Sequence, residues 1–251
     1  MSNLQGKTVV VTGGNSGVGY ATAKKFNELS ANVVITGRNR HAVDEAASTL
    51  GVAGVVADQA DLKAIDDLVS QVKEKFGGVD VLFINAGVAA FAPVEQMTEE
   101  QFDNIMNVNF KGAFFTLQKF LPILREGASV INLSSINAYT GMPNTAAYAA
   151  SKAALNALTR TAAYELAPRG IRVNSVNPGP VNTPIFGKLG MPEEAINEFA
   201  SAMQERIPMK RFGEPDDIAS LVSFLASDEA SFITGSEYNI DGGTNLNPLL
   251  N

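Results

Sequence analysis

Tyr148 and Lys152 are the residues whose types and spacing most directly suggest chemistry. They stand four positions apart in the otherwise small and apolar stretch NTAAYAASKAAL, residues 144–155, and positions i and i+4 share one face of a helix. A lysine ammonium within about 4–6 Å favours the phenolate and lowers the tyrosine pKa from its usual value of about 10. Such a pair is suited to give a proton to a ketone or to take one from an alcohol. The alternative is a tyrosine that packs its ring while the lysine extends to water.

Ser135 stands at the end of the apolar stretch INLSSIN, thirteen residues before Tyr148. At a strand end its hydroxyl could hydrogen-bond a substrate oxygen and stabilise the charge that develops there. Ser134 competes for this role, although we expect it to point to the other side of the strand. Asn107 and Asn109, in MNVNFKG, lie in the middle of a predicted helix, where asparagine is unfavourable. Such a residue is either a tolerated defect or a local water site, and spacing does not choose between the two asparagines.

A glycine-rich stretch, TGGNSGVG at 12–19, joins the first apolar run to a helical pattern. Its glycines permit a tight turn and let backbone N–H groups approach a pyrophosphate, which the positive end of the following helix favours. A simple turn would also use glycine, but the position after the first predicted strand favours a nucleotide site. We therefore expect cofactor contacts at Gly13, Asn15, Ser16, Gly17, Val18 and Gly19.

Arg38 follows the second predicted strand, where Gly37 occupies the position at which a site for NAD usually has a carboxylate. A carboxylate would repel a 2′-phosphate, whereas an arginine attracts it and can bond it through two N–H groups. The alternative is a solvated arginine, with Arg40 close by. The charge pattern therefore favours NADP(H) over NAD(H).

Two further strand ends carry candidate cofactor residues. Asp58 could accept a hydrogen bond from the adenine amino group, although an aspartate that caps a turn is the alternative. Asn85, Ala86 and Gly87 close the fourth predicted strand, where small residues would let a ribose lie against the backbone. Asn85 could also brace neighbouring strands, and a simple strand-end turn remains open.

These residues must be positioned by alternating strands and helices. Stretches rich in Val and Ile predict strands at 7–12, 32–36, 52–57, 79–84, 129–133, 171–176 and 236–240. Helical patterns lie at 16–29, 40–50, 62–76, 99–124, 145–167, 193–207 and 215–225. Helix-capping signals stand at Asp61 and at Thr98 with Gln101. Because several strands are apolar on both faces, the pattern predicts a doubly wound, parallel α/β fold with a single domain over 1–251.

The composition indicates an ordinary globular protein of 251 residues, of which 45% are hydrophobic. Its net charge of −7 argues against nucleic acid or an anionic membrane as a partner. The absence of cysteine excludes disulfides and thiol catalysis. We see no signal peptide and no apolar run that could span a bilayer. We expect a cytoplasmic protein and assign no metal ligands.

Ordered motifs over nearly the whole chain resemble those of the short-chain dehydrogenase/reductase family: VTGGNSGVG, INAG, NVNFKG, LSS, YAASK, NPGPVNTP and DGG. The resemblance implies a Rossmann-type, three-layer αβα fold with seven parallel strands in the order 3-2-1-4-5-6-7. It also implies a catalytic tetrad of Asn109, Ser135, Tyr148 and Lys152, which selects Asn109 over Asn107. In the family the lysine also bonds the nicotinamide ribose, and the asparagine holds a water that passes protons.

The same resemblance implies how NADP(H) is bound. Arg38 matches the NADP-using members, and we count its neighbour Asn39 among the cofactor contacts. One departure is Ile84, where many members have an asparagine, but it ends a buried strand and we expect little effect. The resemblance also implies a homotetramer packed through two long helices and the C-terminal strand. The positions that match the nicotinamide loop are Pro178, Gly179, Val181 and Thr183.

The expected reaction is the NADPH-dependent interconversion of a ketone or aldehyde and an alcohol, with Tyr148 as acid and base. We expect an uncharged substrate in an apolar pocket under a lid at about 180–210. A 3-oxoacyl thioester on a carrier protein is the rival substrate, since Lys188, Lys210 and Arg211 leave a basic entrance open. A second class is a non-enzymatic NADP-binding sensor, and the full tetrad argues against it. A third is a nucleotide-sugar epimerase or dehydratase, which usually has a larger C-terminal substrate domain than this chain. The expected substrate contacts are Phe91, Asn137, Tyr139, Phe186 and Leu189.

Overall fold

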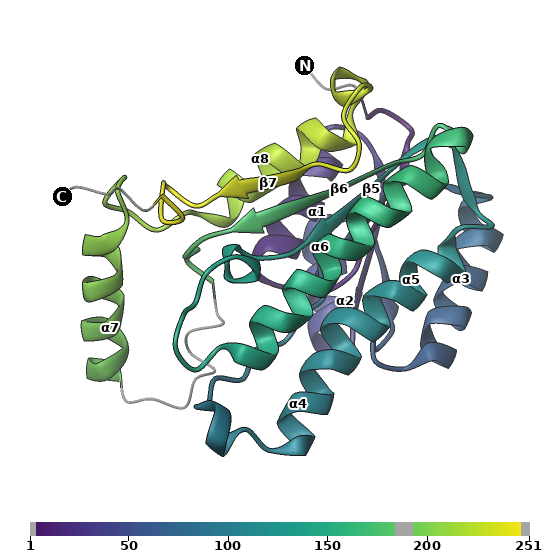
Figure 1. Cartoon of the computed structure of the whole chain (residues 1–251). Coiled ribbons are helices and arrows are strands. Elements are labelled where there is room, and N and C mark those ends of the chain that lie inside the picture. Colours follow the sequence, from purple (N-terminus) through teal and green to yellow (C-terminus); the bar gives the residue numbers. More distant parts are fainter. Residues whose placement is uncertain (1–3, 184–192, 247–251) are drawn as a thin grey trace.

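A seven-stranded sheet forms the centre of the computed structural model, which describes residues 4–183 and 193–246 (Figure 1). Neighbouring strands all run parallel, in the order β3-β2-β1-β4-β5-β6-β7. The predicted strand order and fold class are therefore confirmed. The strands are β1 (Thr8–Val11), β2 (Asn32–Gly37), β3 (Ala53–Val56), β4 (Val79–Ile84), β5 (Leu124–Leu133), β6 (Arg172–Pro178) and β7 (Glu237–Ile240).

Helices cover both faces of the sheet, as the two-sided apolar strands predicted. The side chains of β1 alternate between the two cores, with Val10 in one and Val9 and Val11 in the other. The first core lies under α3 (Leu62–Phe76), α5 (Ala113–Phe120) and α6 (Ala146–Leu166), which face the viewer in Figure 1. The second lies under α1 (Gly17–Glu28), α2 (Arg40–Leu50) and α8 (Pro215–Ala226).

Two predicted helix starts have the expected caps. The Asp61 side chain accepts hydrogen bonds from the backbone N–H groups of Lys63 and Ala64 at the start of α3. Thr98 and Gln101 form a reciprocal capping box at the start of α4 (Glu99–Met106). None of the helices in the described part of the chain is long and apolar enough to cross a membrane. The remaining elements are η1 (Val94–Gln96), η3 (Ile136–Ala138), η4 (Ala167–Arg169), α7 (Glu193–Arg206) and η6 (Asp228–Ala230).

The prediction of one continuous helix over 99–124 is wrong. After α4 the chain forms a π-helical turn, η2 (Asn107–Gly112), and then continues as α5. Residue Leu124, predicted as the end of the helix, instead begins β5 and pairs with Val79 of β4. A π turn contains one more residue than an α turn, and it occurs frequently at functional sites.

Candidate active site

Tyr148 and Lys152 lie on the face of α6 that is turned toward the sheet. Lys152 is 4% exposed, and its Nζ donates to the Leu133 carbonyl at the end of β5, at 2.7 Å. The same Nζ lies 5.8 Å from the centroid of the half-buried Tyr148 ring. Burial lowers the pKa of Lys152 to about 8. The alternative predicted a lysine that extends to water. Lys152 is instead buried and hydrogen-bonded, so that alternative is wrong for the lysine.

The pKa of Tyr148 differs from the expectation. The sequence predicted that Lys152 lowers it, but burial of the phenol raises it above the ordinary value, and a hydrogen bond with Ser135 opposes this rise. The physical reason is that burial disfavours the phenolate, while the ammonium lies over the ring and donates to Leu133. Tyr148 is thus a neutral phenol at neutral pH.

Ser135 and Ser134 face different partners. Ser134 is 3% exposed, and its hydroxyl donates to the backbone carbonyl of Lys152 at 3.0 Å, which ties β5 to α6. Ser135 caps the turn η3, where its hydroxyl accepts from the Asn137 N–H at 3.1 Å. Because Ser135 also bonds Tyr148, it is the serine that the structure brings to the tyrosine.

Asn109 lies in the π turn and is 1% exposed. Its Oδ1 accepts from the Val88 N–H at 2.8 Å, and its Nδ2 donates to the Val88 carbonyl at 2.9 Å and to the Ser151 hydroxyl at 3.1 Å. Ser151 in turn donates to the Tyr148 carbonyl at 2.7 Å. The side chain is therefore a brace between three segments rather than a defect, and Oδ1 retains one lone pair.

Gly87 shows how closely these groups converge. A Cβ at this glycine would lie 3.3 Å from Asn109 Oδ1 and 3.5 Å from Lys152 Nζ. The end of β4, the π turn and α6 therefore meet at one point beyond the strand ends.

The glycine loop is shaped for close backbone approach. Gly13 and Gly17 have φ values of +64° and +53°, which favour glycine. A Cβ at Gly19 would lie 2.3 Å from the Gly13 carbonyl oxygen. Among the residues that the structure describes, the exposed Ser16 side chain makes no capping bond at the start of α1, which leaves that helix end for an anion. These features fit a dinucleotide pyrophosphate.

The remaining cofactor candidates are placed around this loop. Asn85 donates from Nδ2 to the Thr12 carbonyl at 2.8 Å and to the Gly13 carbonyl at 3.1 Å, so it braces two strand ends, as the sequence suggested. Asp58 accepts from the Ala60 N–H at 2.9 Å, so one of its oxygens caps a turn. Asn39 caps α2. Both remain predictions as cofactor contacts.

A side chain at position 37 would require the neighbouring side chains to shift. A Cβ at Gly37 would lie 2.4 Å from Asn15 Oδ1 and 2.9 Å from a methyl group of Val43. Arg38, the next residue, is exposed. The end of β2 therefore presents no carboxylate and is followed by an exposed cation.

The loop after β6 is held by short backbone contacts. The Gly179 N–H donates to the Ile240 carbonyl at 3.1 Å, and a Cβ at Gly179 would lie 2.7 Å from Cβ of Asp241. Val181 is 8% exposed and forms a bridge with Gly213. Pro178 and Thr183, at the two ends of this loop, are partly buried. Figure 1 shows α7 at the side where the strands end.

Three of the expected substrate residues can be placed. Phe91 is 40% exposed, and its ring meets that of Tyr148 edge-on, with the centroids 6.2 Å apart. Asn137 is part of the turn that Ser135 caps. The Tyr139 hydroxyl is bound by the amides of Asn156 and Asn177, at 2.9 Å and 3.2 Å, and by Glu237. Phe186 and Leu189 lie outside the described residues.

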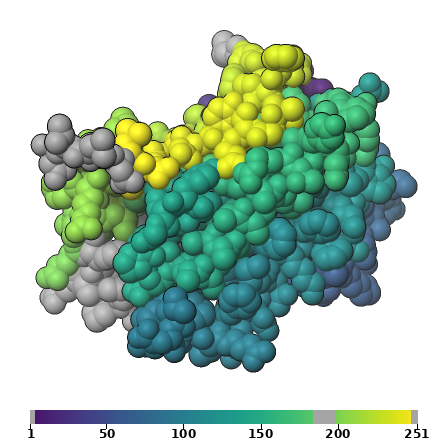
Figure 2. Space-filling view, in the orientation of Figure 1, coloured from purple at the N-terminus to yellow at the C-terminus, as the bar shows by residue number. Residues whose placement is uncertain are grey.

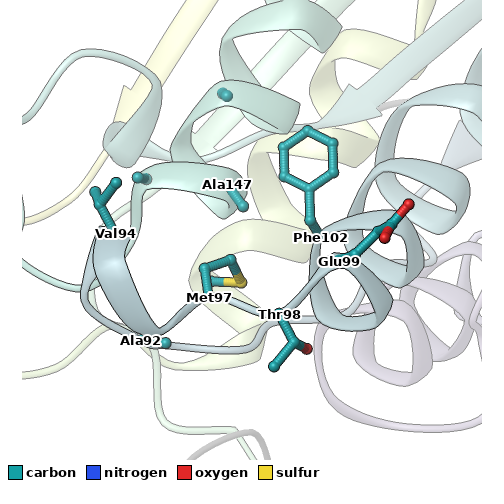
Figure 3. Close-up of a pocket in the computed structure, with 9 residues that line it drawn as sticks. Ala92, Val94, Met97, Thr98, Glu99, Phe102 and Ala147 are labelled. Carbon is teal, nitrogen blue, oxygen red and sulfur yellow. The ribbon is translucent and has the colours of Figure 1, made fainter.

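An open groove lies on a different face of α6 (Figure 3). It has a volume of about 520 Å³ and is mainly apolar. Ala146 and Ala150, which contribute to it, are exposed and lie on the other side of α6 from Tyr148 and Lys152. The groove is therefore separate from the catalytic candidates. Its other lining residues are Ala92, Val94, Met97, Thr98, Glu99, Phe102 and Ala147.

The sequence reasoning missed two polar residues of the site. Ser151 links Asn109 to the Tyr148 backbone. Gln59 follows Asp58 and is 7% exposed. A signal for Ser151 was available, because it stands between Tyr148 and Lys152 on the buried face of α6. Within residues 4–183 and 193–246, no cluster of His, Asp or Glu side chains is placed to hold a metal ion.

Comparison with known proteins places this arrangement in a family. A family model described as Enoyl-(Acyl carrier protein) reductase matches residues 13–245. The 3-oxoacyl-(acyl-carrier-protein) reductase FabG of Thermotoga maritima is 40% identical over 247 residues, which cover 96% of this chain and 98% of the relative. The chain belongs to the short-chain dehydrogenase/reductase family.

Other members of the short-chain dehydrogenase/reductase family are similar over the same length. The NADP-dependent (R)-specific alcohol dehydrogenase of Lentilactobacillus kefiri is 38% identical over 249 residues, covering 96% of this chain and 97% of the relative. A short-chain dehydrogenase/reductase structure from Brucella melitensis, described as a glucose/ribitol dehydrogenase, superposes with a TM-score of 0.92. It is 34% identical and covers 98% of this chain and 99% of that one. The family consists of oxidoreductases that use nicotinamide cofactors.

Proposed function

We propose that this protein is an NADP(H)-dependent oxidoreductase that interconverts a ketone or aldehyde and the corresponding alcohol. The observation that carries the proposal is the state of Tyr148. Burial keeps its phenol neutral, it is hydrogen-bonded with Ser135, and the buried Lys152 ammonium lies 5.8 Å from its ring centroid. This is the arrangement of a proton donor beside a group that stabilises the resulting anion.

The chain's own residues have separate tasks in this reaction. The nicotinamide, when bound, supplies or accepts the hydride. The hydroxyls of Ser135 and Tyr148 hold the carbonyl oxygen, and Tyr148 gives it a proton. Lys152 stabilises the phenolate that remains. Asn109 braces the site, and its free lone pair is available to a water molecule that returns a proton.

The preference for NADP(H) rests on the end of β2. Position 37 is a glycine, so no carboxylate stands there to repel a 2′-phosphate. Arg38 follows at an exposed position and attracts a 2′-phosphate. The alcohol dehydrogenase of Lentilactobacillus kefiri, which is described as NADP-dependent, supports the same choice.

The proposed substrate is an uncharged ketone, aldehyde or secondary alcohol. The exposed Phe91 ring beside Tyr148 supports an apolar contact at the reacting centre. A 3-oxoacyl thioester is the second candidate, because FabG of Thermotoga maritima is 40% identical over nearly the whole chain. Turnover with the thioester and none with free ketones would favour this second candidate.

The test is an NADPH-oxidation screen over aryl ketones, sugars, steroids and acyl thioesters, with Tyr148→Phe as the matched variant. We expect Tyr148→Phe to fold and to bind NADPH but to lose about 1000-fold or more in kcat, because the proton donor is gone. Activity of the variant within a few-fold of wild type would refute the role of Tyr148. A wild-type protein that binds NADPH but turns over none of these substrates would instead favour a sensor.

We propose further that the protein is a homotetramer. Exposed alanines recur along one face of α6 at Ala146, Ala150, Ala153 and Ala157, and Figure 2 shows α6 running across the surface of the molecule. The helices α4 and α5 both contact α6, and each carries an exposed phenylalanine: Phe102 is 44% exposed and Phe114 is 38% exposed. Such a broad apolar surface favours contact with a second copy, and the remaining contacts would be made through β7.

A further inference from the structure

Gln59 lies between β3 and α3 and is 7% exposed. Its Nε2 donates to two backbone carbonyls, that of Ala86 at 3.0 Å and that of Val108 at 2.9 Å. Because carbonyl oxygens only accept hydrogen bonds, both contacts require the NH₂ end of the amide. Ala86 belongs to the segment that closes β4, and Val108 precedes Asn109 in the π turn. One buried side chain thus connects a cofactor segment with a catalytic segment.

The backbone of Gln59 also packs against the π turn. A Cβ at Gly112, the last residue of that turn, would lie 2.2 Å from the Gln59 carbonyl oxygen and 2.9 Å from its Cγ. Gln59 therefore contacts the turn near its start, through Val108, and at its end, through Gly112. These two contacts define how closely the turn approaches the sheet.

Asn109 connects the same two segments beside the Gln59 contacts. Its side chain bonds both the N–H and the carbonyl of Val88, two residues after the carbonyl of Ala86 that Gln59 binds. The side-chain amides of Gln59 and Asn109 thus both link the π turn to the segment that follows β4. Loss of the Gln59 amide would leave two carbonyl oxygens without this donor, which favours a shift of the π turn.

We propose that Gln59 is a positioning residue for Asn109: its amide holds the π turn so that Asn109 meets Val88, Ser151 and the site near Lys152. Gln59 does not contact the reacting atoms in this scheme and acts through Asn109. The inference rests on the proposed function, because it concerns the effect of Asn109 on turnover. Its structural part does not depend on which substrate is used.

Kinetics of a double-mutant cycle test whether Gln59 acts through Asn109. Gln59→Met keeps the length of the side chain but removes the donor, and we expect kcat to fall about tenfold, with the NADPH Kd changed by less than about threefold. In the Asn109→Ala background the same change should have little further effect. Fold-losses that simply multiply in the double variant would overturn the proposal. The matched control is Gln71→Met, which removes an exposed glutamine–carbonyl bond on α3 and should leave kcat within twofold of wild type.

Hydrogen exchange provides a measurement that does not depend on activity. In Gln59→Met the backbone amides of 107–113 and 86–89 should exchange about tenfold faster, whereas Gln71→Met should not change them. Unchanged exchange would overturn the proposal. Should Gln59→Met fail to fold, Gln59→Leu, which is also neutral and lacks the NH₂ group, takes its place. If wild type oxidises no NADPH with any substrate, the proposed function fails while the exchange experiment still decides the role of Gln59.

Discussion

Lys152 is a buried lysine whose ammonium donates to the Leu133 carbonyl. Burial lowers its pKa from an ordinary value of 10.5 to about 8. Such a shift means that the folded protein holds the charged lysine less favourably than the unfolded chain does. The residue therefore destabilises the fold at neutral pH, where it carries the charge that stabilises the Tyr148 phenolate in the proposed reaction.

The first prediction concerns stability and pH. Below about pH 8 the Lys152 amine is protonated in both the folded and the unfolded protein, and the full cost of burying its charge is present. Between about pH 8 and 10.5 the amine is protonated only in the unfolded chain, so the free energy of unfolding rises with pH. We expect the free energy of unfolding of cofactor-free wild type to rise by about 3 kcal/mol relative to that of Lys152→Met between about pH 8 and 10.5. The substitution also removes the donor to the Leu133 carbonyl, and this loss adds a contribution that does not change with pH.

Urea unfolding of both proteins at a series of pH values measures this difference. Lys73→Met, at an exposed position of α3, is the control and should show no such pH-dependent difference. Parallel stability curves for wild type and Lys152→Met would show that burial does not shift the lysine pKa.

The second prediction concerns the coenzyme. Arg38→Ala should lower kcat/KM for NADPH about 10- to 100-fold and leave that for NADH nearly unchanged, because one charge-assisted contact with the 2′-phosphate is lost. Arg40→Ala, at the first position of α2, is the control and should change either value only a few-fold. Wild-type turnover that is equal with NADH and NADPH would contradict the assignment.

At the level of the elements, the glycine loop depends on a close approach between the start of α1 and the end of β1. We expect Gly19→Ala to weaken NADPH binding about tenfold or more and to lower the Tm, because the new Cβ would lie 2.3 Å from the Gly13 carbonyl and 2.5 Å from Asn85 Nδ2. Fluorescence titration with NADPH measures the affinity. Gly141→Ala, where no atom lies within 4 Å of the added Cβ, should bind NADPH as wild type does, and equal affinities in all three proteins would contradict the expected crowding.

Most elements could be predicted from the sequence because their signals are local. The Val-rich strands are apolar on both faces, and Asp61 and Thr98 mark helix starts. The π turn could not be predicted in this way, since the residues of 107–112 continue a helical pattern. The deviation depends on contacts with Val88 and Gln59, which are distant in the sequence.

The types and order of the residues in the sequence predicted which residues form the site, but not their pKa shifts or all of their hydrogen-bond partners. Tyr148, Lys152 and Ser135 are brought together as expected. The direction of the Tyr148 pKa shift was wrong, because it depends on burial and on the position of the ammonium over the ring. The partners of the Tyr139 hydroxyl were equally inaccessible, since Glu237 is 98 residues away in the chain.

For the whole molecule, the proposed tetramer depends on the exposed face of α6. We expect wild type to sediment with about four times the chain mass of 26.5 kDa, and Ala157→Glu to sediment as a dimer or monomer, because the new charge would lie in an apolar interface. Ser70→Glu, on the exposed face of α3, is the control and should not change the mass. A tetramer that persists in Ala157→Glu would show that this face of α6 is not an interface.

The π turn also limits which changes in chain length this protein can tolerate. Each residue of an α-helix advances the side-chain direction by about 100°, so the extra residue in η2 determines which side of α5 meets the sheet. With it, Leu117 and Phe120 are buried at 4% and 0% exposure, and Phe114 is exposed. Deletion of one residue from 107–112 would rotate α5 by about 100° and turn Leu117 and Phe120 away from the first core. Insertions and deletions should therefore be excluded from this stretch, although it contains no strand and borders a surface helix.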